Sequence, residues 1–465
     1  MNRRKFNLLG ACSVVALSAG VVLPKTARAA VSANKAALLK TTLTPMGSER
    51  AGNADGSIPA WTGGATTVPA GWTSDQLVMP DMFADEKPLF TVDAANAAQY
   101  LNQLSDGIKM LMQKIGISIN VYPTHRTAAA PQAIYDNIYQ NALNAEPHPQ
   151  GARFGFSGAF GGVPFPVPDD DDNQGAEIIW NHLTRWFGYN YNRTMSSFIS
   201  TGGSIQLAST VGLQQHFDYY ELNGSVASFD GILSKLRTSI FAPPPLYGQE
   251  LIEYDYTNPH KYPAEIWQLL DGQGRVRKAP ELAFDTPFPG SAGFGYFDEL
   301  KGFFGSPEKY EWKSLGKLEM FIPYNNNGQF FKTPDKLFHP EYLNSNLVRW
   351  EKHRVWVVDA TLAPGERNVV ARRKFYIDED TWMVTLVDEY DAQGKLWKVL
   401  CQYNEVRPDV PGTLAAGLLI MDLQASSYIY SLAPFNDPQL GSVLTTTDAP
   451  PQRFNPQDMA ASAQY

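Results

Sequence analysis

The feature that most constrains the fold is a run of four short apolar segments between Arg349 and Asn404, separated by turn residues. Within each segment apolar side chains recur at every second position, which is the pattern of an antiparallel strand with one face in the core. The breaks at 362–365, 378–380 and 391–394 carry residues that favour turns. The stretch therefore predicts a meander of four strands, around which the rest of the chain is organised.

The alternation also predicts that the aromatic side chains of this meander share one surface. The residues expected there are Trp356, Val358, Ala360, Trp382, Val384, Leu386, Trp397, Val399, Cys401 and Tyr403. The opposite faces carry a polar set mixed with aliphatic residues: Asp359, Thr385, Glu389, Lys398 and Gln402. Because side chains on one strand alternate between the two faces, this pattern predicts a sheet with one strongly aromatic side.

Residues 1–30 have the order of charge and apolarity that is typical of a signal peptide. A basic start at 3–5 precedes a small, apolar run from Leu8 to Leu23, and residues 27–29 form an A-x-A cleavage signal. The apolar run is shorter than the roughly 20 residues that span a bilayer. We therefore expect the mature chain to begin near Ala30 and to act in the periplasm. Arg3 and Arg4 also fit a twin-arginine signal, so the export route stays open, as does association with the outer membrane.

Charge and cysteine content narrow the possible partners. The net charge of −9 argues against a nucleic-acid partner, which would require a basic surface. If Cys12 leaves with the signal peptide, Cys401 is the one remaining cysteine and no intramolecular disulfide can form. The fold must then depend on its hydrophobic core.

The remaining chain divides by composition. Residues 31–90 are rich in turn signals and predict an extended N-terminal arm, with Trp61 and Trp72 as anchors. Residues 91–188 predict a helical and loop region, with helices at 93–115, 131–143 and 176–187. Residues 189–410 predict the antiparallel half-barrel, in which 225–236 is either a helix or a loop and 271–274 is a hairpin turn. Residues 411–465 predict a C-terminal segment and a mobile tail.

The sequence contains no recognisable catalytic or metal motif. It lacks G-x-S-x-G and H-E-x-x-H, and its seven His residues do not pair at metal-ligand spacing. The acidic run 169–172 lacks the distal Glu of a calcium loop and is interpreted as a solvated turn. His125 and His182 are interpreted as structural hydrogen-bonding residues. We therefore expect no catalytic residue, no metal and no cofactor.

Five segments together resemble the exported bacterial family DUF1329. They are TLTPMGSERAGNADGSIPAWTGG, DEKPLFTVDAANAAQY, VYPTHRTAAAPQAIYDN, GGVPFPVPDDDDNQGAEIIWNHLTRWFG and RKFYIDEDTWMVTLVDEYDAQGKLWK. The resemblance runs from about Thr41 to Asn404 and beyond. It implies an α+β fold like that of outer-membrane lipoprotein-sorting proteins: a curved antiparallel half-barrel closed by helices around an apolar cavity. It also implies a link with the export or uptake of hydrophobic compounds, beside an envelope transporter or outer-membrane protein.

Together these observations favour a periplasmic carrier or accessory protein that binds a lipid or another hydrophobic small molecule. The aromatic residues expected to line its groove are Trp267, Trp356, Trp382, Tyr390, Trp397 and Tyr403. Two alternatives remain. An exported hydrolase acting on lipid or polymer would need His125 or His182 beside a carboxylate in a cleft. A non-catalytic envelope scaffold would have a fully packed sheet interior.

Overall fold

The computed structural model describes residues 31–73, 76, 79–270, 275–279, 284–288, 291–433, 442–443 and 451–462. In this part of the chain, sixteen strands form one sheet with the order β1-β2-β12-β13-β14-β15-β16-β17-β5-β6-β7-β8-β9-β10. Strand β11 pairs with β12 and β18 with β5. Every pairing is antiparallel except that of β2 with β12. The fold is therefore mixed α and β with a mostly antiparallel sheet, and the sheet is not closed into a barrel.

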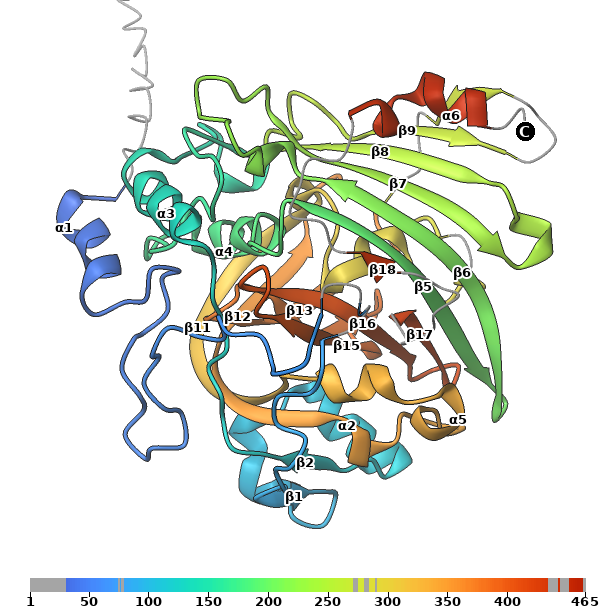
Figure 1. Cartoon of the computed structure of the whole chain (residues 1–465). Helices are drawn as coiled ribbons and strands as arrows, with labels where there is room; N and C mark the ends of the chain where they lie inside the picture. Colours follow the sequence, from blue (N-terminus) through green and yellow to red (C-terminus); the bar gives the residue numbers. More distant parts are fainter. Residues whose placement is uncertain are drawn as a thin grey trace, which may run out of the picture.

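The strands of this sheet differ widely in length. Their bounds are β1 Phe90–Val92, β2 Ile119–Val121, β5 Asn190–Thr201, β6 Ser204–His216, β7 Ile232–Ala242, β8 Glu250–Tyr256, β9 Glu265–Leu269, β10 Val276–Lys278, β11 Tyr310–Pro323, β12 Arg349–Leu362, β13 Arg372–Asp378, β14 Val384–Tyr390, β15 Leu396–Arg407, β16 Gly412–Asp422, β17 Ser427–Ala433 and β18 Ser442–Val443. A separate pair consists of β3 Glu146–Pro147 and β4 Phe156–Ser157. Figure 1 shows β5 and β6 as long curved strands beside the orange and red meander.

The helices are short. The α-helices are α1 Ala33–Ala36, α2 Asp106–Ile115, α3 Gln132–Asn144, α4 Gln174–Leu183, α5 Pro334–Leu337 and α6 Pro456–Ser462. Two of the 3₁₀ turns matter below: η2 Ala97–Gln103 and η6 Phe297–Gly302. Helices α3 and α4 lie at one side of the sheet in Figure 1, and α2 lies beside β1 and β2 at the lower end.

The four predicted meander strands are confirmed as β12 to β15, but the single aromatic face is wrong. Both faces of these strands are buried, in two separate cores. Trp382 and Val358 pack in the first core with α3 and α4, whereas Cys401 and Tyr403 pack in the second core with α2. Register shifts between Tyr376 and Ile377 and between Glu389 and Tyr390 explain in part why residues predicted on one face lie in two different cores. A bulge inserts one residue, so the strict alternation used for the prediction fails beyond it.

The polar side chains predicted on the opposite faces of the meander are mostly buried as well. Lys398 pairs with Glu299 of η6 at 2.6 Å, and Glu389 pairs with Arg373 at 2.9 Å. Each of these four side chains is at most 2 % exposed. Charges with no access to water are stable only when they are paired, so η6 is fixed to the sheet by ion pairs.

Three further elements differ from the sequence-based prediction. The sheet continues past residue 410, because β16 and β17 connect the meander to β5. Strand β16 is buried on both faces, so its apolar residues do not alternate with polar ones. The segment 225–236 contains the start of strand β7. The helix expected over 93–115 is split into η2 and α2, since Leu104 is extended and Ser105 caps α2 by accepting a hydrogen bond from the Ile108 N–H.

The described residues of the segment 31–89 contain little regular structure, and hydrogen bonds attach several of them to the body. Arg126 donates to the carbonyls of Glu49, Arg50 and Pro59, and the Trp61 indole donates to the carbonyl of Ala128 at 2.9 Å. That the whole segment acts as one arm, and that helices close the half-barrel, stay predictions. The predicted signal peptide, the 271–274 turn and residues 434–441, 444–450 and 463–465 of the predicted tail lie outside the described residues.

Candidate functional site

An apolar pocket of about 310 Å³ lies between strands β6 to β8, the end of α4 and the loop 303–309. A second cavity of about 60 Å³ adjoins it, and Gln215, Lys301 and Phe304 line both. The principal apolar side chains of the two are Phe187, Phe217, Leu233, Phe303, Val211, Leu213, Leu236, Leu251 and Ile266. The combined space is in the size range of small-molecule sites, which begins at about 300 Å³.

Strand register explains why these residues meet. Leu213 pairs with Thr238 and Thr238 with Leu251, so all three project from the same face of neighbouring strands. The next row, two residues along, joins Gln215, Leu236 and Glu253 in the same way. The pocket wall is therefore one continuous face of β6, β7 and β8.

The opposite wall is a turn that places a charged residue in the pocket. Lys301 has φ 57°, a left-handed conformation that is uncommon for a residue with a side chain. Gly302 follows at φ 84°, and a Cβ there would lie 2.7 Å from Val384 Cγ1. The glycine lets the turn pack against the meander, while the Lys301 side chain reaches Gln215 Oε1 at 2.6 Å.

Four ionisable side chains gather where the two cavities meet: Arg185, Glu253, Asp255 and Lys301. Burial lowers the pKa of Lys301 to about 7, and repulsion from Arg185 acts in the same direction. Burial also raises the pKa of Asp255 to about 7 and that of Glu253 well above its usual range. Burial lowers the pKa of Arg185 to about 9, so the guanidinium remains charged at neutral pH. The pocket is thus apolar with a small charged cluster.

None of the six aromatic residues predicted from sequence is among the described residues that line these two cavities. Trp267 packs against Tyr254 with ring centroids 4.8 Å apart, while its neighbour Ile266 lines the pocket. Because adjacent strand residues point to opposite faces, Trp267 points away from it. Trp356 and Trp382 stack on each other at 6.4 Å, and the Trp382 indole donates to the carbonyl of Met46.

The other three predicted residues lie elsewhere on the meander. The Tyr390 hydroxyl bonds Asp106 at the start of α2, and the Trp397 indole donates to Asp422. Tyr403 is fully buried in the second core beside Tyr430. The structure therefore does not bring the six together, and a role for any of them in ligand binding stays a prediction.

The two His residues of the hydrolase alternative differ in environment. His182 is fully buried: its Nδ1 accepts from the Val384 N–H at 3.0 Å, and its Nε2 lies 3.2 Å from the Phe303 carbonyl oxygen. Burial lowers the pKa of His182 well below its usual value, so it is a neutral structural residue. His125 does meet a carboxylate, Glu86, at 2.7 Å. The second Glu86 oxygen is 2.6 Å from Arg349, so this carboxylate joins two basic residues in a surface network.

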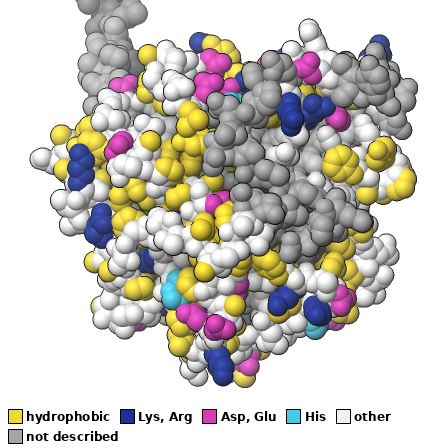
Figure 2. Space-filling model, in the orientation of Figure 1, with side chains coloured by type: hydrophobic (Ala, Val, Ile, Leu, Met, Phe, Trp, Pro, Cys, Tyr) yellow, Lys and Arg dark blue, Asp and Glu magenta, His cyan; other side chains and the backbone are white. Residues whose placement is uncertain are grey.

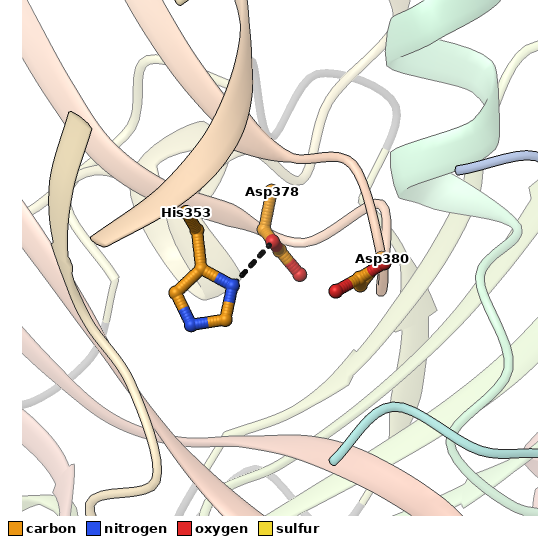
Figure 3. Close-up of side chains that lie close together, drawn as sticks. All are labelled: His353, Asp378 and Asp380. Carbon is orange, nitrogen blue, oxygen red and sulfur yellow. Dashed lines mark ion pairs between the residues drawn. The ribbon is translucent and has the colours of Figure 1, made fainter. Parts of the chain in front are cut away.

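A third cluster has the composition of a metal site. His353, Asp378 and Asp380 offer ligand atoms within 4.8 Å of one another, and Figure 3 shows His353 turned toward Asp378. However, Arg126 donates to both oxygens of Asp380, at 2.8 and 2.6 Å. A cation bound there would have to displace a buried guanidinium. The cluster is better described as an ion-pair network that fixes the β13–β14 turn.

A more open cavity of about 450 Å³ lies near Tyr122, Asn325 and Arg349. Its charged lining residues are Asp81, Glu86, Lys332 and Arg349, of which Glu86 and Arg349 pair with each other, so a larger share of this cavity's lining is polar. On the face of the molecule shown in Figure 2, acidic, basic and hydrophobic side chains are interspersed. The first pocket is therefore the strongest candidate site.

Sequence reasoning missed most residues of this site. Strand β7 was not recognised, because its apolar residues in ILSKLRTSIFA are interrupted by charged ones. Lys301 lies in a Gly- and Phe-rich segment, and the aromatic content of that segment was the one sequence feature that could have indicated a pocket there. Arg185 follows the apolar face of α4, a polar residue beside apolar structure.

Among the described helices, none is both long and apolar enough to cross a membrane. The family model described as protein of unknown function (DUF1329) matches residues 91–460. The uncharacterized protein PA3922 of Pseudomonas aeruginosa is 37% identical over 429 residues, which cover 90% of each chain.

Solved structures give weaker likenesses. A domain described as an outer membrane lipoprotein-sorting protein, from Vibrio parahaemolyticus, has 17% identity and a TM-score of 0.42, covering 62% of this chain and 100% of that one. A DUF1329 family protein from Desulfovibrio piger has 11% identity and a TM-score of 0.39, covering 57% and 91%. A LolA superfamily protein from Nitrosomonas europaea has 9% identity and a TM-score of 0.36, covering 60% and 97%.

Proposed function

The chain belongs to the DUF1329 family, and from that premise we propose that it binds a lipid or another hydrophobic molecule. The binding site in this proposal is the pocket between β6–β8, the turn η6 and the loop 303–309. We propose further that it acts as a non-enzymatic carrier or accessory protein in the periplasm, delivering its ligand to an envelope transporter or an outer-membrane protein. The observation that carries the proposal is the apolar pocket of about 310 Å³ with its smaller neighbour.

Burial of apolar surface supplies the binding energy in this proposal. Each Å² of apolar ligand surface removed from water contributes about 25 cal/mol before ordering costs are subtracted. Phenylalanine side chains on both walls, including Phe187 and Phe304, offer such surface without a competing hydrogen-bond requirement. A carrier of this kind needs no nucleophile, which agrees with the structural environment of His182.

The first test is binding of the uncharged fluorescent probe N-phenyl-1-naphthylamine to the purified chain, together with native mass spectrometry for co-purifying lipid. The probe should bind with micromolar affinity, which corresponds to about 8 kcal/mol. Absence of both probe binding and co-purified lipid would contradict the proposal and favour a scaffold.

A pair of variants on strand β6 places the binding in this pocket. Leu213 lines the smaller cavity, whereas Leu207 on the same strand is 51% exposed. Leu213→Trp should fill the cavity and weaken probe binding on the order of tenfold, about 1.4 kcal/mol. Leu207→Trp should leave binding unchanged. Equal affinities for both variants would show that the probe binds elsewhere.

A further inference from the structure

The charged cluster in the pocket contains a buried arginine for which the described residues supply no acidic partner. Arg185 is 3% exposed. Its Nη1 donates to the His182 carbonyl at 2.6 Å, while Nε and Nη2 have no hydrogen-bond partner among the described residues. A guanidinium carries five N–H donors, and leaving buried donors unsatisfied is costly. The Arg185 side chain lines the pocket, so a negatively charged group bound there would lie beside the guanidinium.

Arg185 differs in this respect from the other buried arginines that the structure describes. Each of those lies within 4 Å of at least one carboxylate oxygen: Arg126, Arg193, Arg349, Arg373 and Arg407. Among the described residues, Arg185 is therefore the exception to the pairing of buried guanidinium groups with acids. An anionic ligand could pair with the Arg185 guanidinium as the carboxylates pair with the other buried arginines.

A second cation lies beside the same aromatic ring. The Arg185 guanidinium carbon is 5.2 Å and Lys301 Nζ is 5.5 Å from the ring centroid of Phe187. Lys301 is bound to a neutral acceptor, Gln215, rather than to a carboxylate. Two cations on one ring repel each other, and an anion between them would relieve that repulsion.

We propose that Arg185 and Lys301 bind the anionic headgroup of an amphiphile, a carboxylate or a phosphate, while its apolar tail lies against β6, β7 and β8. This inference rests on the proposed function and names the class of ligand. The nearby acids Glu253 and Asp255 agree with it, since burial raises the pKa of both and limits their negative charge. Asp255 lines the pocket, and its Oδ2 has no hydrogen-bond partner among the described residues.

The test compares amphiphiles with the same tail and different heads. Oleate, 1-oleoyl-lysophosphatidate and uncharged monoolein are each used to displace N-phenyl-1-naphthylamine from the full chain near neutral pH. Both anions should displace the probe at concentrations on the order of 10- to 100-fold lower than monoolein, as expected for charge-assisted hydrogen bonds. A lead of oleate over the lysophosphatidate identifies a carboxylate ligand, and the reverse identifies a phosphate; both support the proposal.

Variants of Arg185 and Lys301 test whether these two cations cause the preference for anionic amphiphiles. Arg185→Met and Lys301→Met should each reduce the advantage of the anions over monoolein on the order of tenfold. Lys301 is only half-buried, so Lys301→Met carries the test if Arg185→Met does not fold. Lys235→Met is the matched control, because this half-buried lysine of β7 pairs with Asp218 and does not line the pocket.

The outcomes separate the two proposals. If all three amphiphiles displace the probe equally, the headgroup site is wrong and the hydrophobic carrier stands. If the anions lead but Lys301→Met and Arg185→Met retain that lead, the headgroup binds elsewhere and this inference is overturned. If neither the probe nor any amphiphile binds, the proposed function fails.

Discussion

At the scale of single residues, the neighbours Arg372 and Arg373 show how far burial changes the value of a charge. Arg373 is 1% exposed and pairs with Asp298 and Glu389, both at 2.9 Å. Arg372 is 38% exposed and pairs with Asp359 at 2.8 Å. The distances are nearly equal, but only the ion pairs of Arg373 are shielded from water.

Arg373→Met should lower the free energy of unfolding by about 3–5 kcal/mol, because it leaves two buried carboxylates without a cation. Arg372→Met, the control, should cost no more than about 1 kcal/mol, since exposed ion pairs contribute little. Urea titrations of both variants measure the difference. Similar losses in the two would show that burial does not decide the strength of these pairs.

Asp388 provides a pH-dependent prediction. Its carboxylate accepts from the Tyr376 hydroxyl, the Ser105 hydroxyl and the Gly107 N–H, yet burial raises its pKa to about 6. A raised carboxyl pKa means that the folded state holds the proton more tightly than the unfolded state. The contribution of the protonated Asp388 carboxyl to the free energy of unfolding is therefore present below about pH 4 and is lost as the pH rises through about 6.

Asp388→Asn removes this titration. The difference in the free energy of unfolding, variant minus wild type, should rise by about 2–3 kcal/mol between roughly pH 4 and pH 8. Asp391→Asn is the control: hydrogen bonds, led by that from the Lys395 N–H, lower the pKa of this exposed carboxyl. Its variant should show no such rise. A flat profile for Asp388→Asn would contradict the assignment.

At the scale of elements, the sequence predicted strands better than the faces they present. The meander, the helix at 131–143 and the hairpin of β9 and β10 follow from local alternation and turn residues. Local alternation does not predict the orientation of Trp356 relative to Tyr403, because that orientation depends on bulges that no local pattern marks. The pocket was missed for a related reason: Arg185 and Lys301 are 116 residues apart and meet only through packing.

At the start of α2, close packing favours Gly107 although alanine has the higher helix propensity. A Cβ at Gly107 would lie 2.3 Å from Asp388 Oδ1 and 2.6 Å from Val399 Cγ1. Gly→Ala within an exposed helix gains about 1 kcal/mol, but here the methyl group has no space. Gly107→Ala should therefore destabilise the protein by about 1–3 kcal/mol.

A double-mutant cycle identifies the cause of that loss. Val399→Ala alone should cost about 1–3 kcal/mol through the cavity it leaves. In the double variant the methyl group introduced by Gly107→Ala can enter that cavity, so the two losses should sum to more than the measured total. Thermal or urea unfolding of the four proteins gives the coupling energy. Strict additivity would show that Val399 does not limit the space at Gly107.

At the scale of the whole molecule, Arg126 joins the N-terminal segment to the sheet. The same guanidinium binds both oxygens of Asp380 in the β13–β14 turn and three carbonyls between Glu49 and Pro59. One side chain therefore couples the order of a segment without regular structure to the stability of the meander. The pocket beside β6–β8 shares none of these contacts.

Arg126→Met should thus separate two properties of the molecule. The N-terminal segment should become sensitive to limited proteolysis, and the free energy of unfolding should fall by about 3–5 kcal/mol because Asp380 is left buried and unpaired. Where the variant remains folded, its affinity for N-phenyl-1-naphthylamine should equal that of the wild type. Arg50→Met is the control, because Arg50 donates to Thr41 and Leu43 within the segment itself. Weaker probe binding by folded Arg126→Met would show that the N-terminal segment is coupled to the pocket.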